Sequence, residues 1–226
     1  MAAPTYDPTS APRRWHMVNE QLSGRGIHES RILSAFLEVP REAFLPPELR
    51  PRAYEDGPLP IEEGQTISQP YVVAWMAEAA ELTPTSRVLE VGTGSGYGAA
   101  ILGELAGEVV TVERIRRLAE AARARLAALG YENITVEEGD GSLGFAARQP
   151  FDAIVVTAAG PSVPEALLAQ LSPEGRLVMP VGTTSRQRLI RVRHKRSVFV
   201  TEDLGAVTFV PLIGAQAFRD IDAVPA

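Results

Sequence analysis

The chain has 226 residues, of which 45% are hydrophobic and 22% charged, and its formal net charge is −6 at pH 7. This length and composition predict one soluble globular α/β domain with a short appendage, and they exclude global disorder. Nucleic-acid-binding surfaces depend on clustered lysine and arginine, and the chain has no cysteine for a disulfide or a zinc site, so we expect neither a nucleic-acid partner nor a catalytic metal.

The N-terminal residues 1–16 contain three prolines among small and polar residues and show no apolar periodicity, which predicts a mobile extension. We expect residues 17–226 to form a single domain. Within it, residues 17–80 are predicted to be a helical lobe that ends in a loop, residues 81–182 a βαβ core, and residues 183–226 C-terminal strands and a tail.

The expected helices and strands follow from the apolar periodicity. Residues 18–49 have apolar side chains at three- and four-residue spacing, which predicts helices, and a further helix is expected over residues 71–82. From residue 87 onward, short apolar strands alternate with helices, which is typical of a parallel sheet. The expected strands are 87–91, 109–112, 134–137, 151–156 and 176–179, and the expected helices are 97–105, 115–129 and 164–171.

The C-terminal part has strand character without intervening helices, over residues 189–193, 197–201 and 206–211. We therefore expect an antiparallel edge on a mostly parallel sheet. Residues 186–196 contain five arginines and one lysine, but over residues 190–193 the arginines alternate with apolar residues. This alternation is typical of a half-buried strand with a solvated face, and we prefer that interpretation to a nucleic-acid-binding patch.

No apolar run approaches the roughly 20 residues that a membrane-spanning helix needs. The longest runs, such as residues 153–159, are much shorter, and no basic-then-apolar signal sequence opens the chain. We therefore expect a cytoplasmic protein without a membrane partner.

A glycine-rich turn, Gly92-Thr93-Gly94-Ser95-Gly96, follows the expected strand 87–91. It removes side chains at the carboxyl end of a strand, where open α/β sheets bind cofactors. The spacing of Gly94, Gly96 and Ala99 also satisfies the G-x-G-x-x-A pattern of dinucleotide folds. The glycines by themselves leave a nicotinamide cofactor, S-adenosylmethionine and a turn without a ligand as open alternatives.

Three carboxylates narrow this choice. Glu113 ends the second strand, 21 residues after Gly92, where a carboxylate can accept hydrogen bonds from both ribose hydroxyls. Glu90 lies where the ammonium group of S-adenosylmethionine would bind, and Asp140 can accept from an adenine amino group. Each acid also has an ordinary structural alternative, as a helix N-terminal or turn residue. Together they favour a class I methyltransferase.

Residues 88–97 (VLEVGTGSGY) and residues 64–70 (GQTISQP) form two longer motifs. They resemble the cofactor loop and the more specific substrate-side signature of the protein-L-isoaspartate O-methyltransferases. The other matching blocks are residues 25–27, 39–41, 139–141, 150–159, 180–182 and 209–212. The resemblance covers roughly residues 17–218. Glu62, Glu63 and Phe145 depart from the usual family residues.

The resemblance implies a Rossmann-like fold: a mostly parallel central sheet with helices on both faces, an antiparallel C-terminal edge and an N-terminal helical lobe. It implies an enzyme that methylates the α-carboxylate of L-isoaspartyl residues in damaged proteins and so initiates their repair through a succinimide. The cofactor would be S-adenosylmethionine and its product S-adenosylhomocysteine, bound by residues 81–182. The enzyme is expected to be a monomer.

The resemblance also implies a set of site residues. Ser68 is the expected catalytic residue, and it lies in the substrate loop at the end of the lobe of residues 17–80. A serine two residues before Pro70 is also a good helix N-cap, so this alternative stays open. The implied cofactor contacts are Glu90, Gly92, Thr93, Gly94, Ser95, Gly96, Glu113, Asp140, Gly141 and Thr157. The implied substrate contacts are Thr66, Ile67, Ser68, Ala158, Val181, Gly182 and Leu212.

Three competing functions share parts of this pattern. A methyltransferase acting on a small molecule or on RNA would share the cofactor half, but it would not need residues 64–70. A nicotinamide-dependent oxidoreductase or a non-catalytic nucleotide-binding module would share only the glycine turn.

Overall fold

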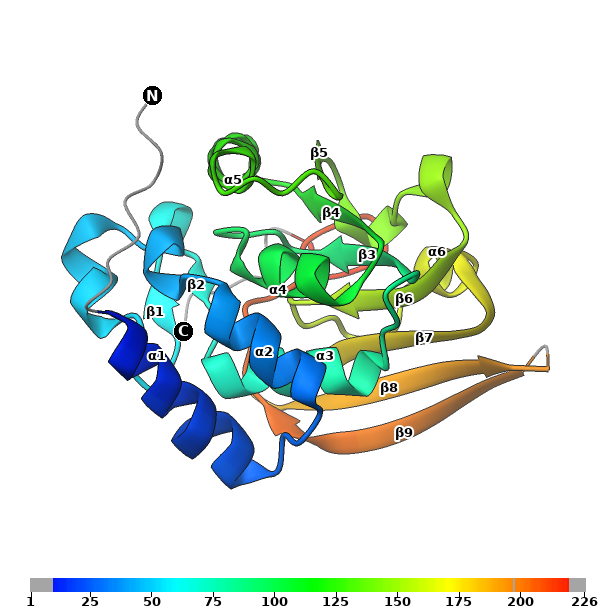
Figure 1. Cartoon of the computed structure of the whole chain (residues 1–226). Coiled ribbons are helices and arrows are strands. Elements are labelled where there is room, and N and C mark those ends of the chain that lie inside the picture. Colours follow the sequence, from blue (N-terminus) through cyan, green and yellow to red (C-terminus); the bar gives the residue numbers. More distant parts are fainter. Residues whose placement is uncertain (1–9, 197, 220–226) are drawn as a thin grey trace.

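Seven strands form a sheet at the centre of the molecule (Figure 1), and they are β3 (Arg87–Val91), β4 (Glu108–Glu113), β5 (Ile134–Glu138), β6 (Phe151–Val156), β7 (Leu171–Gly182), β8 (Gln187–Lys195) and β9 (Val198–Val207). The structure is a computed structural model and describes residues 10–196 and 198–219. The strand order is β5-β4-β3-β6-β7-β8-β9; β3 to β7 are parallel, and β8 and β9 are antiparallel additions. The expected fold class, with its antiparallel C-terminal edge, is confirmed.

Helices cover both faces of this sheet. On one face lie α3 (Pro70–Ala80), α4 (Tyr97–Leu105) and α5 (Arg116–Ala128). The other face is covered by the short α6 (Glu165–Leu168), together with loops and the C-terminal segment. Successive residues of a strand point to opposite faces, so Val88 packs with the α3 side and Leu89 with the α6 side. Burial on both faces explains why these strands are nearly continuous apolar runs.

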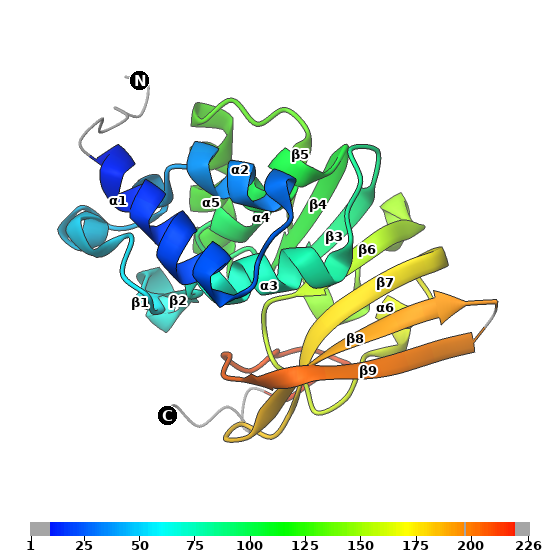
Figure 2. The same ribbon diagram turned by 60° about the horizontal axis from the view of Figure 1, so that its bottom comes forward.

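An N-terminal helical lobe packs over α3 and α4. It contains α1 (Ala11–His16), α2 (Ser30–Glu38) and the short helical turns Met17–Leu22, Ser23–Arg25, Arg41–Phe44 and Pro47–Arg52. The lobe and the long strands β7, β8 and β9 lie on opposite sides of the molecule (Figure 2). Two short strands, β1 (Leu59–Pro60) and β2 (Thr66–Ile67), form an antiparallel pair where the lobe meets α3.

Helix α3 connects the lobe to the sheet edge. It starts with Pro70 at a first-turn position, where the missing N–H costs nothing. It ends at Glu81, whose left-handed conformation (φ 49°) stops the helix. The Glu81 carboxylate pairs with Arg176, Arg191 and Arg193 on β7 and β8. The contacts with Arg193 and Arg176 lower the pKa of Glu81 to about 2. The end of α3 is therefore tied to the antiparallel edge.

The structure differs from the expectation for residues 1–16, because Ser10 to His16 are ordered. Residues 11–16 form α1, and Ser10 and Arg14 are 0% and 3% exposed. The Ser10 hydroxyl donates to Glu42 at 2.6 Å, and Arg14 pairs with the same carboxylate at 3.3 Å. This burial depends on polar side chains, so apolar periodicity did not predict it. Residues 1–9 lie outside the described residues.

The C-terminal strands also differ from the expectation. Residues 189–193 lie in β8 and residues 198–201 in β9, and these two strands pair antiparallel; Ser197 lies outside the described residues. Residues 206–211 do not form a separate strand, since β9 ends at Val207 and Pro211 makes one isolated bridge with Ala159. The helix expected over residues 164–171 is only four residues long. In the part of the chain described, no helix has the length and hydropathy that crossing a membrane requires.

Candidate active site

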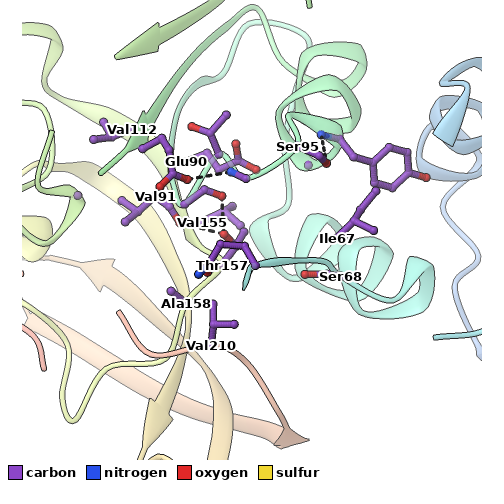
Figure 3. A pocket seen from close by; sticks show the side chains of 18 of the residues that line it. Ile67, Ser68, Glu90, Val91, Ser95, Val112, Val155, Thr157, Ala158 and Val210 are labelled. Carbon is purple, nitrogen blue, oxygen red and sulfur yellow. Dashed lines mark hydrogen bonds between the residues drawn. The ribbon is translucent and has the colours of Figure 1, made fainter. Parts of the chain in front are cut away.

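A cavity lies at the carboxyl ends of β3, β4 and β6, next to the glycine turn after β3 (Figure 3). Gly92 has φ +96°, in the left-handed region that favours glycine. A side chain at this position would also collide with Thr157 Oγ1. The Thr157 hydroxyl donates to the Gly92 carbonyl at 2.7 Å and lies 3.1 Å from the Val91 carbonyl. The end of β6 is thus bound directly to the backbone of the turn.

Glu113, at the end of β4, holds the other side of the turn. It is 7% exposed. The Gly94 N–H donates to its Oε2 at 2.9 Å, and the Ile115 N–H donates to its Oε1 at 3.0 Å. Each carboxylate oxygen has two acceptor positions, so both retain capacity for further donors. A ligand with vicinal hydroxyls would meet a carboxylate that the backbone has already oriented.

Glu90 is a carboxylate with almost no access to water, at 1% exposure. The Thr111 hydroxyl donates to its Oε2 at 2.6 Å, and the Thr111 and Thr93 hydroxyls are 2.6 Å apart. Burial raises the pKa of Glu90 to about 8, and the nearby charge of Glu113 acts in the same direction. A cationic group in the cavity would favour the ionised form.

Ser68 lies across the cavity from these groups, in the loop between β2 and α3. Ser68 and Ile67 are on one side of the cavity, and Thr157, Ala158 and Val210 are on the other (Figure 3). Helix α3 begins at Pro70 with Gln69 as its cap residue, and no side chain caps it. The alternative interpretation of Ser68 as an N-cap is therefore wrong. Among the described residues, no hydrogen bond occupies its hydroxyl.

Most of the predicted site residues line this one cavity. They are Thr66, Ile67, Ser68, Glu90, Gly92, Thr93, Gly94, Ser95, Glu113, Gly141, Thr157, Ala158 and Leu212. Gly96, Asp140, Val181 and Gly182 lie outside its lining. Gly96 lies beside Ala122 and Leu126 of α5, and its φ of +91° is in the left-handed region that favours glycine.

Asp140 binds the C-terminal segment in this structure. Its Oδ1 accepts from the Ser142 N–H at 2.9 Å and the Ser142 hydroxyl at 2.7 Å, and its Oδ2 accepts from the Ala215 N–H at 2.7 Å. Gly141, the next residue, lines the cavity. Contact of Asp140 with an adenine amino group stays a prediction.

Val181 and Gly182 contact Gly160, in the loop after β6. The Gly182 N–H donates to the Gly160 carbonyl at 2.9 Å. The Leu212 N–H donates to the Ala159 carbonyl at 2.7 Å, which holds the C-terminal segment beside the loop after β6. This loop forms the cavity wall opposite Ser68.

Several lining residues were not predicted. They are Gln65, Val73, Met76, Ala77, Val91, Tyr97, Gly98, Ile101, Leu102, Val112, Arg114, Ile115, Val155, Val210, Pro211 and Ile213. Gln65 and Tyr97 belong to the two recognised motifs, so their positions were a usable signal. The importance of Gly98 could not be predicted from the sequence, because it depends on a contact made only in the folded chain. A side chain at this position would collide with the Glu90 carboxylate.

Tyr97 links the cavity to the N-terminal lobe. Its ring packs edge-on against Phe36 and Phe44, and the Arg41 guanidinium carbon lies 4.8 Å from the ring centroid. Arg41 is fully buried, which lowers the pKa of its guanidinium. The lobe is therefore packed directly onto the first residue of α4.

The chain matches the protein-family model described as Protein-L-isoaspartate(D-aspartate) O-methyltransferase (PCMT) over residues 13–217. Curated proteins similar to the chain include protein-L-isoaspartate O-methyltransferase 2 of Pelobacter propionicus, which is 55% identical over 91% of this chain and 92% of the relative. The protein-L-isoaspartate O-methyltransferase of Methanoregula boonei is 51% identical over 94% of this chain and 98% of the relative.

Two solved structures are similar to this chain over most of its length. A structure named protein-L-isoaspartate O-methyltransferase matches with a TM-score of 0.82 and 33% identity, over 90% of this chain and 67% of that chain. A Plasmodium falciparum structure assigned to the same activity, in complex with S-adenosyl-L-homocysteine, matches with a TM-score of 0.78 and 25% identity, over 88% of this chain and 98% of that chain.

Proposed function

The chain belongs to the protein-L-isoaspartate(D-aspartate) O-methyltransferase family, and on this premise we propose that the cavity at the carboxyl ends of β3, β4 and β6 is its active site. The chain is an enzyme that transfers a methyl group from S-adenosylmethionine to the α-carboxylate of L-isoaspartyl residues in damaged proteins. The neighbouring backbone nitrogen then displaces methanol from this ester to close a succinimide, and hydrolysis of the succinimide returns a fraction of the damaged residues to normal aspartate.

The residues of the cavity fit S-adenosylmethionine. When bound, this cofactor supplies an electrophilic methyl group on a sulfonium centre. Its ammonium and sulfonium groups are positively charged, and the cavity carries the two carboxylates Glu90 and Glu113. The Glu113 carboxylate can accept hydrogen bonds from the two adjacent ribose hydroxyls. We assign the remaining cofactor contacts to the turn of residues 92–96, to Asp140 and Gly141, and to Thr157.

The substrate supplies its own nucleophile, so the protein needs no general base. The free α-carboxylate of an isoaspartyl residue has a reference pKa of about 3.3–3.7 and is ionised at neutral pH. The contribution of the chain is to orient this carboxylate and exclude water, and orientation of this kind can contribute about 7–11 kcal/mol. We assign the orienting contact to the Ser68 hydroxyl, with Thr66, Ile67, Ala158 and Leu212 as neighbours on the substrate side.

One observation carries this assignment: Ser68 and the two carboxylates Glu90 and Glu113 line the same cavity, although they come from different parts of the chain. A methyl donor bound by the carboxylates and a substrate held by Ser68 would therefore meet. Val181 and Gly182 would act indirectly, by holding the loop after β6 in place.

We also propose that the enzyme acts as a cytoplasmic monomer without a nucleic-acid partner. The arginines of β8 support this proposal, because they face carboxylates rather than a free basic surface. Arg188 pairs with Asp203, Arg191 with Glu202, and Arg193 with Glu81. These pairs neutralise three of the six cationic residues in positions 186–196.

The activity is tested by transfer of labelled methyl from S-adenosylmethionine to two peptides that differ only in holding one L-isoaspartyl or one L-aspartyl residue. We expect base-labile label on the isoaspartyl peptide alone. Label on neither peptide, with S-adenosylmethionine still bound, would move the assignment to another acceptor, such as a small molecule or RNA.

The role of Ser68 is tested by Ser68→Ala in the same assay. Removing a hydroxyl that stabilises the reacting groups should lower kcat/KM by about a hundredfold. The dissociation constant of S-adenosylhomocysteine, measured by calorimetry, should not change. A folded variant with wild-type kcat/KM would show that Ser68 is not catalytic.

A further inference from the structure

We infer that Asp56 is a positioning residue of the active site, because it holds the loop that carries Ser68 through Gln69 and Arg25. This inference rests on the proposed role of Ser68. Asp56 lies in the segment between Ala53 and β1, outside the cavity and outside the motifs that identify the family here.

The Asp56 carboxylate contacts the residue next to Ser68. Gln69 Nε2 donates to Asp56 Oδ1 at 2.7 Å. Gln69 is also the cap residue of α3. The contact therefore fixes the point at which the extended loop turns into the helix, one residue beyond the catalytic hydroxyl.

Arg25 extends this contact into the N-terminal lobe. Arg25 Nη1 is 3.2 Å from both Asp56 carboxylate oxygens. Its guanidinium carbon lies 3.7 Å from the centroid of the Tyr71 ring, in the first turn of α3, which is a close cation–π contact. Asp56 and Arg25 together hold the residues on the α3 side of Ser68, and we name this group the Asp56 clamp (Arg25, Asp56, Gln69 and Tyr71).

The other side of Ser68 is anchored independently. The pairing of β1 with β2 joins Leu59 to Ile67 and Pro60 to Thr66, and the Ile61 N–H donates to the Gln65 carbonyl at 2.8 Å. Ser68 is the residue between these two anchors, and no hydrogen bond to other described residues holds its side chain. Its position in the cavity therefore depends on both anchors.

The clamp is better suited to position the loop than to stabilise the fold. The side chains of Arg25 and Asp56 are 41% and 45% exposed, and ion pairs between exposed side chains contribute little to stability. Loss of the clamp should leave the chain folded and the cofactor side intact, while the loop gains freedom. A misplacement of about 1 Å at a reacting group can lower a rate about a hundredfold.

The test compares Asp56→Ala with Glu55→Ala in the methyl-transfer assay with the isoaspartyl peptide. Glu55 is the neighbouring residue and forms its own exposed ion pair, with Arg52, so its variant is a matched control. We expect Asp56→Ala to lower kcat at least tenfold, with little change in KM or in the dissociation constant of S-adenosylhomocysteine. Glu55→Ala should keep wild-type kcat.

Two further variants separate positioning from a general loss of structure. Asp56→Asn keeps an acceptor for Gln69 and should restore part of kcat, whereas Gln69→Met removes the donor and should reproduce the loss. In a Ser68→Ala background, Asp56→Ala should cause little further loss, because the residue that it positions is gone.

The outcomes distinguish the positioning role of Asp56 from the catalytic role of Ser68. Wild-type kcat in Asp56→Ala, or an equal loss in Glu55→Ala, overturns the positioning role and leaves that of Ser68 intact. A full additional loss in the Ser68→Ala background shows that Asp56 acts elsewhere and also overturns the inference. Wild-type activity of Ser68→Ala alone contradicts the catalytic role of Ser68, on which the inference rests, and leaves the proposed activity intact.

Discussion

The two sides of the active site are built in different ways. On the cofactor side, buried carboxylates bind backbone groups and hydroxyls of neighbouring strands, as Glu113 does with the Gly94 N–H and Glu90 with Thr111. On the substrate side, the loop carrying Ser68 is held by a short strand pair and by the exposed side chains of the Asp56 clamp. The side that we assign to the cofactor is therefore held by buried contacts within the sheet, whereas the loop that we assign to the substrate is held partly by exposed contacts with the N-terminal lobe.

This difference suits a repair enzyme that must accept many protein segments. The cofactor is always the same molecule, so a buried and pre-oriented site stabilises it without further adjustment. The acceptor carboxylate occurs in variable surroundings, and exposed contacts at the loop place few restrictions on the flanking chain. Variants that act on one side and spare the other test this division.

The largest effect is expected for Arg14→Ala, in the lobe that supports the substrate loop. Arg14 pairs with the buried Glu42, and its Nε donates to the Tyr54 hydroxyl at 2.8 Å. Removing one partner of a buried ion pair leaves an uncompensated charge, so the free energy of unfolding should fall by about 3–5 kcal/mol. Chemical denaturation measures this change.

Arg13→Ala is the control for that variant. Arg13 is exposed and makes one hydrogen bond to the Pro51 carbonyl, so its loss should change the free energy of unfolding by less than about 1 kcal/mol. Equal stabilities of the two variants would contradict the view that α1 is an integral part of the lobe.

A strong effect confined to the cofactor side is expected for Gly92→Ala. The new methyl group would collide with Thr157 Oγ1, and the left-handed backbone adds strain of about 1–3 kcal/mol. We expect the affinity for S-adenosylmethionine, measured by calorimetry, to fall by about a hundredfold or more.

Gly130→Ala is the matched control for Gly92→Ala, since Gly130 has φ +86° but no atom within 4 Å of an added Cβ. It shares the backbone strain without the collision, so its cofactor affinity should be that of the wild type. If Gly92→Ala also bound the cofactor normally, the turn would not form part of the binding site.

A smaller and pH-dependent effect is expected for Glu90→Gln. The pKa of Glu90 is about 8 in the folded chain and about 4.5 in the unfolded chain, so between these values only the folded state keeps the proton. Stability should therefore fall with rising pH in this window and level off above pH 8. Glu90→Gln should remove this contribution and be more stable than the wild type at pH 9.

The same substitution should weaken cofactor binding. The ionised carboxylate favours a cationic ligand, so wild-type affinity for S-adenosylmethionine should rise with pH up to about 8. Glu90→Gln should lack this rise and bind about tenfold more weakly at pH 9, since a hydrogen bond to a charged group is worth about 1.5–3 kcal/mol. Thermal denaturation and calorimetry at pH 6 and pH 9 measure both effects, and parallel pH profiles of the two proteins would exclude an ammonium contact at Glu90.

Much of the cofactor side was predictable because its signals are local. Gly92, Glu90 and Glu113 lie at strand ends, and the carboxyl ends of parallel strands meet at one edge of a sheet, so their convergence follows from the alternation of strands and helices. Asp140 and Gly96 satisfied the same local pattern but lie outside the cavity lining, because one binds Ala215 and the other packs against α5.

The amino-acid sequence by itself determined the order of strands and helices, the glycine turn and the two motifs, since each depends on residues a few positions apart. Only the tertiary structure decided which polar side chains meet across long separations. Ser10 and Arg14 reach Glu42, Glu81 reaches three arginines of the sheet edge, and Arg25 and Asp56 meet beside Ser68. These contacts carry no periodic signal, because a polar residue is buried or paired only where the folded chain brings it a partner.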